Sequence, residues 1–346
     1  MQTPISQLPS APRPVSAESV GGSLLVSARE RLARVTPEIE WAVLAPELEA
    51  IDRLKQERGA IVLAHNYQTP EIFHGVADLT GDSLALAQRG AETQAEVIVL
   101  CGVHFMAETA KILSPTKTVL IPDLDAGCSL ASSITAADVR LLKSRYPGAP
   151  VVTYVNTSAE VKAESDICCT SANAVEVVES LGCERVIFLP DEYLGRYVAD
   201  RTEVEVILWQ GHCEVHERFT AGEIRSYRDL HPGIRVLAHP ECPPDVLAEA
   251  DFVGSTAGMI RHVSEVRPRR VVMVTECSMS DNVAVEYPEI DFIRPCNLCP
   301  HMKQITLPKI RQALERLEHR VEVEEEVASR AREAVQRMLD IGRRGQ

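Results

Sequence analysis

The sequence has few aromatic residues and few positive charges for its length. Phe, Trp and Tyr together make up 4% of the 346 residues, too little for broad platforms on which bases or sugars could stack. Lys and Arg number 36 against 50 Asp and Glu, which gives a formal net charge of −14. Because nucleic acids and anionic membranes attract basic surfaces, this balance argues against both as partners. It still permits an anionic small substrate, since a local pocket can oppose the field of the whole surface.

Long apolar stretches are also missing. No run of 18 apolar residues occurs, so we expect no segment that spans a membrane. Residues 1–22 are rich in Pro, Ser and Gly and have no apolar segment after a basic start, which argues against a signal peptide. We therefore expect a cytoplasmic protein in which residues 1–45 form a flexible extension without an assigned role.

Cysteine is too sparse for a disulfide scaffold, with 10 in the whole chain. In a reducing compartment, cysteines are buried thiols, metal ligands or catalytic groups more often than disulfides. Five of them lie in or beside apolar runs and are expected to be small buried side chains: Cys101, Cys168, Cys183, Cys242 and Cys277. The remaining ones need a different explanation.

The chain does contain a regular alternation of short β-branched runs and helical stretches. Residues 59–67, GAIVLAHNY, are apolar until the run ends in polar groups, which is typical of a strand buried in a parallel sheet. Similar runs recur at 95–102, 117–123, 150–156, 184–191, 204–211, 234–241, 250–255 and 270–277. Because helical patterns lie between many of them, the sequence predicts an α/β fold with parallel sheets.

This alternation occurs in three similar units. Three strands end in polar triplets, which begin at His65, Tyr154 and His239. A helix start bearing a hydroxyl follows each triplet after 17 or 18 residues, at Ser83, Ser171 and Thr256. A cysteine follows each hydroxyl after a further 42 to 45 residues, at Cys128, Cys213 and Cys299. These three cysteines are 85 and 86 residues apart.

The repeat predicts three similar three-layer αβα domains with small parallel sheets. We place them at residues 46–128, 129–213 and 214–302, with helices in 303–346 completing the first. Ligands of such sheets bind outside the carboxyl ends of the strands, where the polar triplets lie. A pseudo-threefold, triangular arrangement would therefore bring all three triplets and all three cysteines to one central active site.

Three thiolates from three domains suit a cuboidal 4Fe–4S cluster that leaves one iron without a protein ligand. An open iron can act as a Lewis acid on a substrate oxygen. The Cys296–Cys299 C-x-x-C could instead be a redox pair, half a zinc site or part of a cluster site. No second C-x-x-C completes a zinc ribbon, but tetrahedral zinc near His212, Cys213 and His216 is an alternative.

Two further groups of side chains point to chemistry on an anionic substrate. Acid–base candidates follow the strand ends: His65, Tyr67, Tyr154, His239 and Glu241. Hydroxyls stand at predicted helix N-termini, where free N–H groups favour carboxylate or phosphate: Ser83, Thr170, Ser171, Ser255 and Thr256. Simple helix capping is compatible with this second interpretation.

From about residue 48 to 340, the chain resembles the quinolinate synthase family. The resemblance lies in long segments that follow the family's order. They include IVLAHNYQ (61–68), GDSL (81–84), FMAETA (105–110), PDLDAGCSL (122–130), YVNT (154–157), TSAN (170–173), LGRY (194–197), GHC (211–213), HPE (239–241), GST (254–256) and CPHMK (299–303).

The resemblance implies condensation of iminoaspartate with dihydroxyacetone phosphate to quinolinate, phosphate and water, in NAD biosynthesis. It implies a 4Fe–4S cluster held by Cys128, Cys213 and Cys299, and three α/β domains in a triangle. Its motifs assign catalysis to Tyr67, Tyr154, His239 and Glu241. They assign substrate binding to His65, Ser83, Tyr154, Asn156, Ser171, His239, Glu241, Ser255 and Thr256. L-aspartate oxidase, as the source of iminoaspartate, is an expected functional partner.

One segment departs from the family's pattern. Some members carry C-x-x-C-x-x-C near the C-terminus, where this chain has Ile293, Cys296 and Cys299. A redox switch through the outermost thiol pair therefore lacks one of its thiols. Two functions from other classes remain as alternatives: a non-catalytic iron–sulfur sensor, and a zinc hydrolase that uses His212, Cys213 and His216.

Overall fold

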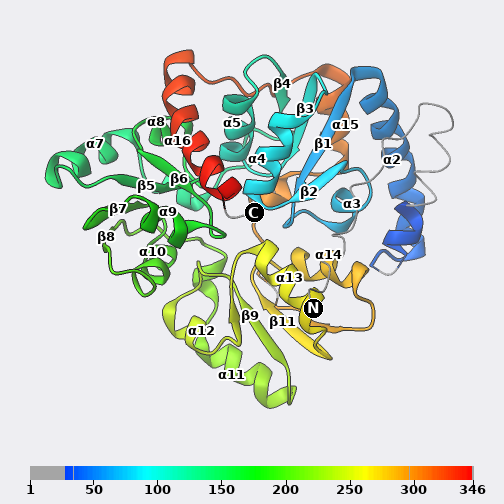
Figure 1. Cartoon of the computed structure of the whole chain (residues 1–346). Helices are drawn as coiled ribbons and strands as arrows, with labels where there is room; N and C mark the ends of the chain where they lie inside the picture. The colour runs from blue at the N-terminus through cyan, green and yellow to red at the C-terminus, as the bar shows by residue number, and fades with distance from the viewer. Residues whose placement is uncertain (1–27, 34, 296, 345–346) are drawn as a thin grey trace, which may run out of the picture.

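The computed structural model describes residues 28–33, 35–295 and 297–344. Its strands form three parallel sheets of four strands each, with helices packed on them, so the predicted α/β fold class is confirmed. Figure 1 shows three lobes arranged as a triangle that meet near the centre of the molecule.

The first sheet has the order β2-β1-β3-β4. Its strands are β1 (Ala60–His65), β2 (Leu79–Gly81), β3 (Val97–Cys101) and β4 (Thr118–Leu120). Its helices are α2 (Glu38–Arg58), α3 (Pro70–Phe73), α4 (Ser83–Glu92) and α5 (His104–Leu113). Strand β3 is buried along its whole length, as expected for a central parallel strand covered on both faces.

The second sheet repeats this order as β6-β5-β7-β8. Its strands are β5 (Val151–Tyr154), β6 (Ile167–Cys169), β7 (Arg185–Leu189) and β8 (Glu205–Leu208). Its helices are α6 (Ser129–Ser132), α7 (Ala136–Arg145), α8 (Ala159–Ala163), α9 (Ala174–Ser180) and α10 (Glu192–Ala199). Thr135 and Asp138 form a capping box that fixes the start of α7.

The third sheet has the order β10-β9-β11-β12. Its strands are β9 (Arg235–Ala238), β10 (Phe252–Val253), β11 (Arg270–Val274) and β12 (Asp291–Ile293). Its helices are η1 (His216–Arg218), α11 (Ala221–Leu230), α12 (Pro244–Ala248), α13 (Thr256–Val266) and α14 (Ser278–Glu286). The hydroxyl of Ser255 accepts a hydrogen bond from Gly258 N and caps α13, where the sequence predicts a helix start.

The shared strand order determines where a ligand can bind. In each sheet the first strand lies between the second and the third, so the chain changes direction across the sheet at the pairs β1/β3, β5/β7 and β9/β11. In open α/β sheets, the crevice outside the carboxyl ends of such a strand pair is the usual ligand site. The polar triplets of the sequence follow β1, β5 and β9, one strand of each pair.

Three strands had no counterpart among the apolar runs of the sequence: β2, β6 and β12. Each has three residues and lies at the edge of its sheet. An edge strand this short carries too little periodicity to be distinguished from a loop, which explains why the pattern missed them.

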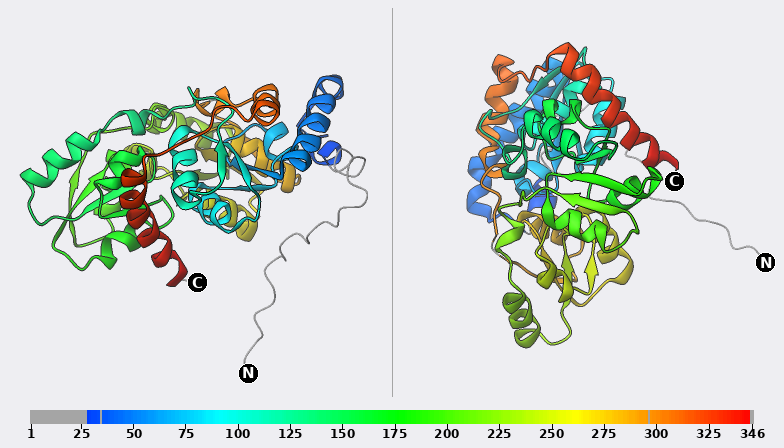
Figure 2. Two further views of the ribbon diagram at one scale, coloured as in Figure 1. Left: turned by 90° about the horizontal axis from the view of Figure 1, so that it is seen from above. Right: turned by 90° about the vertical axis from the view of Figure 1, so that its left-hand side faces the viewer.

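The C-terminal helices join the first and second units. After η2 (Met302–Gln304), helix α15 (Leu307–Arg316) contacts α2 and β3 of the first unit. Helix α16 (Glu325–Arg344) contacts α8 and β6 of the second unit and α5 of the first, and it ends the described chain beside them (Figure 2).

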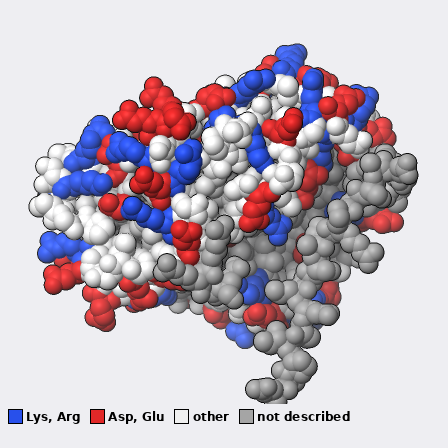
Figure 3. All heavy atoms as spheres, turned by 45° about the horizontal axis from the view of Figure 1, so that its top comes forward, with Lys and Arg blue, Asp and Glu red and all other residues white. Residues whose placement is uncertain are grey.

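Acidic and basic side chains are interspersed on the face drawn in Figure 3, without a large region of one sign. Among the described residues, none of the helices combines the length and the apolar character that crossing a bilayer requires.

Candidate active site

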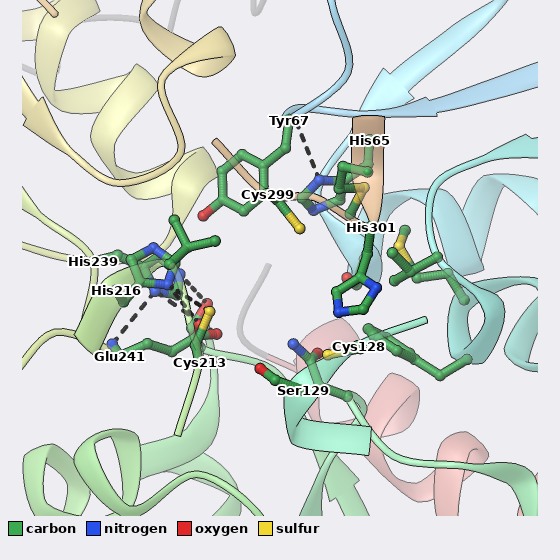
Figure 4. Close-up of a pocket in the computed structure, with 18 of the residues that line it drawn as sticks. His65, Tyr67, Cys128, Ser129, Cys213, His216, His239, Glu241, Cys299 and His301 are labelled. Atoms are coloured by element: carbon green, nitrogen blue, oxygen red, sulfur yellow. Dashed lines mark hydrogen bonds and ion pairs between the residues drawn. The ribbon is translucent and has the colours of Figure 1, made fainter. Parts of the chain in front are cut away.

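A cavity lies where the three units meet. Its volume is about 740 Å³, which includes the space where it opens to solvent. Ten side chains predicted from the strand and helix ends line it: His65, Tyr67, Ser83, Tyr154, Asn156, Thr170, Ser171, His239, Glu241 and Thr256. The three predicted cluster ligands, Cys128, Cys213 and Cys299, line it as well. Figure 4 shows these cysteines on different sides of the cavity. The structure therefore brings together residues that are far apart in the sequence.

The first unit contributes His65 and Tyr67, which follow β1. The imidazole Nδ1 of His65 accepts a hydrogen bond of 3.2 Å from the backbone N–H of Tyr67, and the two rings meet edge to face. Burial lowers the pKa of His65 to about 4, so the ring is neutral near pH 7. Burial, and the nearby charge of Glu241, raise the pKa of Tyr67 well above its usual value and keep the phenol protonated.

The second and third units meet at Tyr154 and Glu241. The Tyr154 hydroxyl donates a hydrogen bond of 2.6 Å to Glu241 Oε1, and His216 Nδ1 lies 2.8 Å from Glu241 Oε2. Burial alone would raise the pKa of Glu241, but the rings of His239 and His216 and these hydrogen bonds hold it below its usual value. The carboxylate is therefore ionised and accepts hydrogen bonds from two directions.

His239 lies beside this group and faces the second unit. Its Nε2 is 3.2 Å from the hydroxyl of Ser171, and its ring stacks on His216 with centroids 4.7 Å apart. Burial lowers the pKa of His239 to about 3, so this imidazole is neutral near pH 7. A neutral imidazole can accept a proton from a substrate or present an N–H to it, depending on its tautomer.

The predicted hydroxyls occupy different places relative to the helix starts. Ser83 and Thr256 are the first residues of α4 and α13, and both line the cavity. Thr170 and Ser171 also line it, but they lie in the turn before Asn173, which precedes α9. Ser255 does not line the cavity, because its hydroxyl caps α13.

The cavity lining contains neither lysine nor arginine. Helix N-termini, hydroxyls and amides are thus the groups available to an anion there. Asn156 has a buried side-chain oxygen without a hydrogen-bond partner among the described residues, in the wall of the cavity. A buried polar atom in this state is costly unless a ligand or water satisfies it.

The three lining cysteines lie on loops that follow β4, β8 and β12, the last strands of the three sheets. Hydrogen bonds connect these loops. The Ser129 hydroxyl donates to His212 O and accepts from Glu214 N, both at 3.1 Å, and His301 Nε2 is 2.8 Å from Glu214 Oε1. The cysteine loops thus support one another around the cavity.

This donor set fits a cuboidal iron–sulfur cluster. Thiols from three separate loops reach one cavity, and the sulfurs that bind different irons of a cluster lie farther apart than ligands sharing one ion. Burial raises the pKa of Cys128 to about 12 and also raises the pKa values of Cys213 and Cys299. Coordinated iron would hold them as thiolates, since a metal-bound thiol is deprotonated.

A second arrangement could hold a single ion. The ligand atoms of Cys213, His216 and Glu241 lie within 4.8 Å of one another, the one such group found in the described part of the chain. His212, which the zinc alternative requires, does not join them. Its Nε2 lies 2.9 Å from Glu192, and its ring stacks on Tyr193 with centroids 4.6 Å apart. The zinc set of His212, Cys213 and His216 is therefore not assembled.

The other cysteines fall into two groups. Cys101, Cys168 and Cys242 are buried, as the sequence predicts, and Cys169 is buried as well. Cys183 and Cys277 are partly exposed, so the expectation that they are buried was wrong for these two. Cys183 lies in the turn between α9 and β7, and Cys277 lies just before α14. Cys296 lies outside the described residues.

Sequence reasoning assigned no catalytic or substrate-binding role to four residues that surround the site: His216, Thr275, Glu276 and Lys303. His216 was predicted only as a ligand in the zinc alternative. Thr275 and Glu276 follow β11, the partner of β9 at the third crevice. The Lys303 amine donates to Tyr67 O at 2.7 Å and pairs with Glu276 at 2.9 Å. The sequence contains a signal for Thr275 and Glu276, because the apolar run 270–277 ends in polar groups, as the strands before the polar triplets do.

The sequence was compared with known protein families and proteins. Residues 49–340 match the family described as quinolinate synthetase A protein. The protein named quinolinate synthase 1 from Mesorhizobium japonicum is 68% identical over 310 residues, covering 90% of this chain and 96% of that protein. A quinolinate synthase from Agrobacterium fabrum is 65% identical over 312 residues, covering 90% of each chain. One from Xylella fastidiosa is 64% identical over 295 residues, covering 85% of this chain and 87% of that protein.

Proposed function

The chain belongs to the quinolinate synthetase A family, and on this premise we propose the reaction and the residues that perform it. It is an enzyme of the quinolinate synthase class, which acts in NAD biosynthesis. The proposed reaction condenses iminoaspartate with dihydroxyacetone phosphate to quinolinate, phosphate and water. One observation carries the proposal: acid–base groups, anion-binding helix starts and three cysteines from three units line the same cavity.

Groups without a formal positive charge would bind the substrate anions. The N-termini of α4 and α13, with Ser83 and Thr256, would receive carboxylate or phosphate oxygens. Asn156, Ser171 and the neutral ring of His65 would add hydrogen bonds from the other walls. Ser255 would contribute through the helix start that it caps.

Proton transfer falls to four side chains that face the cavity: Tyr67, Tyr154, His239 and Glu241. Condensation, closure of the ring and the loss of water each require protons to be moved at carbon, nitrogen and oxygen. Glu241 can act as a base because it is ionised, and neutral His239 can accept a proton at the ring nitrogen that carries no hydrogen. The protonated phenols of Tyr67 and Tyr154 can donate to a developing oxyanion.

Cys128, Cys213 and Cys299 would hold a 4Fe–4S cluster at the wall of the cavity. When bound, an iron without a protein thiolate supplies Lewis acidity for the removal of a hydroxyl group. The surrounding protein contributes by burial, since Tyr154, His239 and Glu241 in the cavity wall are largely shielded from solvent.

The test is an anaerobic assay of purified protein for quinolinate, together with metal and sulfide analysis of the same sample. The proposal expects quinolinate only when both substrates are present, and iron with acid-labile sulfide in the protein. Iron and sulfide without quinolinate would favour the sensor alternative. Zinc without sulfide would favour a hydrolase and contradict the cluster.

Other parts of the proposal rest on the family or on the sequence alone. We propose a cytoplasmic enzyme that receives iminoaspartate from L-aspartate oxidase. The proposed domains are 46–128 with 303–346, 129–213 and 214–302, after an N-terminal extension at 1–45. Of this extension, residues 1–27 and 34 lie outside the described residues, and residues 38–45 belong to α2. Limited proteolysis would test these boundaries, since cleavage is expected between domains before it occurs within them.

A further inference from the structure

Thr275 holds two residues of the site with one hydroxyl. Its Oγ1 lies 2.6 Å from the hydroxyl of Tyr67 and 2.9 Å from Nε2 of His216. Tyr67 follows β1 in the first unit, His216 begins η1, and Thr275 follows β11 in the third unit. Thr275 is completely buried, so water does not compete for these contacts.

The contacts of Thr275 belong to a longer chain of hydrogen bonds. From His216 the chain continues through Nδ1 to Glu241 Oε2 at 2.8 Å. Glu241 Oε1 then accepts the hydrogen bond of 2.6 Å from Tyr154. Three side chains, Thr275, His216 and Glu241, thus connect the phenol of Tyr67 with the phenol of Tyr154 across all three units. Thr275 is the one next to Tyr67.

The chemistry of each group assigns one donor and one acceptor to every hydrogen bond in this series of side chains. An ionised carboxylate only accepts hydrogen bonds, so His216 presents an N–H to Glu241 at Nδ1, and in the tautomer with this one ring proton its Nε2 is an acceptor. The Thr275 hydroxyl then donates to Nε2, and its oxygen accepts the hydrogen bond of Tyr67. Valine at this position could occupy the same volume but could neither donate to His216 nor accept from Tyr67.

The backbone around Thr275 is fixed, so the hydroxyl cannot readily turn away. Thr275 N donates to Met273 O at 3.0 Å. The carboxylate of the next residue, Glu276, accepts from Ser278 N at 2.9 Å and from Cys299 N at 3.4 Å. Glu276 also pairs with Lys303, whose amine bonds Tyr67 O. Thr275 thereby holds the side chain of Tyr67, and Lys303, which pairs with Glu276, holds its backbone carbonyl.

We propose that Thr275 is a positioning residue that fixes the Tyr67 hydroxyl and the His216 ring for the reaction. This inference rests on the proposed function, because it assigns Tyr67 to proton transfer. Thr275 acts through Tyr67 and His216 and is not itself in the wall of the cavity. Loss of its hydroxyl should lower kcat and leave KM nearly unchanged, since the substrate-binding groups stay in place.

The experiment compares Thr275→Val with Thr275→Ser in the cluster-loaded enzyme. We expect Thr275→Val to lower kcat by about 10- to 100-fold, as loss of two buried hydrogen bonds allows, and Thr275→Ser to restore most of it. In a Tyr67→Phe background, which has no phenol to position, the same Val substitution should cause a smaller loss, since only the contact with His216 remains to be removed. Each variant used should be folded at the assay temperature, and its iron and sulfide content should match the wild type.

Each outcome decides the inference. Equal kcat in the Val and Ser variants, or a loss of the same size in the Tyr67→Phe background, would refute it. If Thr275→Val does not fold or load, Thr275→Ala against Thr275→Ser gives the same comparison, since that pair differs by one hydroxyl. A wild-type enzyme that makes no quinolinate would reject the proposed function instead, which separates the two failures.

Discussion

Tyr154 donates a hydrogen bond to Glu241 across the boundary between the second and third units, with 2.6 Å between the two oxygens. Tyr154 ends β5 and Glu241 follows β9, so this contact exists only when the two sheets are docked. Both side chains are buried, which makes the hydrogen bond to the ionised carboxylate strong. The hydrogen bond therefore fixes the positions of two acid–base candidates relative to one another.

Tyr154→Phe is expected to lower kcat by about 100- to 10,000-fold, the range for removal of a general acid–base group. The substitution removes the phenol proton and leaves Glu241 Oε1 without its donor. Steady-state kinetics of quinolinate formation under anaerobic conditions measure the effect. Tyr146→Phe, at the end of α7 away from the cavity, is the matched control and should leave kcat unchanged. A variant with normal kcat and raised KM would reduce Tyr154 to a binding role.

Alanine at any one of Cys128, Cys213 and Cys299 is expected to abolish stable cluster binding. Each substitution removes one of the three thiols that reach the cavity, and two thiolates leave the cluster with too few protein ligands. The measurement is iron and acid-labile sulfide per chain after anaerobic purification. Cys183→Ala, in a partly exposed thiol remote from the cavity, should keep the wild-type content. A Cys128→Ala protein with full iron and sulfide content would disprove the ligand assignment.

The sequence predicted the central strands and the site residues that follow them, because both depend on local patterns. The run 59–67 is apolar and ends in polar groups, which indicates a buried strand and a strand-end site together. The start of α13 at Thr256 was also predicted, since the hydroxyls of Ser255 and Thr256 are typical of a helix N-terminus.

Long-range contacts explain what the sequence could not predict. Thr275 and His216 resemble ordinary strand-end and loop residues until the units dock and place one beside Tyr67 and the other beside Glu241. The direction of His212, toward Glu192 and Tyr193, likewise depends on contacts with another helix. Neither can be read from spacing along the chain, because spacing does not specify which loops meet.

Lys162 and Glu108 are buried, oppositely charged side chains that act on each other electrostatically, and loss of this interaction should destabilise the protein. Lys162, on α8, is the one lysine that is fully buried in the described structure, and it lies over the ring of Phe105 at 5.4 Å. Burial lowers the pKa of Lys162 and raises that of Glu108, and the opposite charges counteract both shifts. Lys162→Met leaves Glu108 without its cation, at an expected cost of about 3–5 kcal/mol of unfolding free energy.

A double-mutant cycle with Glu108→Gln separates the charge pair from packing. Glutamine removes the charge but keeps an oxygen that can accept the hydrogen bond from Ala159 N. The double variant should therefore be more stable than the sum of the two single losses implies. Thermal unfolding of the anaerobic holoprotein is the measurement. Arg53→Met, in an exposed pair with Glu57, is the control and should cost less than about 1 kcal/mol. Strict additivity in the cycle would mean that the pair is not coupled.

His74 should make the protein sensitive to mild acid. It lies at the end of α3 in the first unit, and its Nε2 is 3.1 Å from Asn282 O on α14 of the third unit. Burial lowers the pKa of His74 to about 4, from 6.5 in the unfolded chain. Between these two values the unfolded state binds more protons, so stability is complete above pH 6.5 and falls as the pH drops toward 4. At about pH 5 this single group should cost about 2 kcal/mol.

His74→Gln tests this, because glutamine can keep a donor toward Asn282 O and does not titrate. Thermal unfolding of wild type and variant is compared at about pH 7.5 and pH 5. Other buried histidines, such as His65 and His239, titrate in both proteins and cancel in the comparison. The variant should gain about 2 kcal/mol on the wild type as the pH is lowered. An unchanged difference between wild type and His74→Gln at the two pH values would show that His74 takes up its proton without opening the contact between the first and third units.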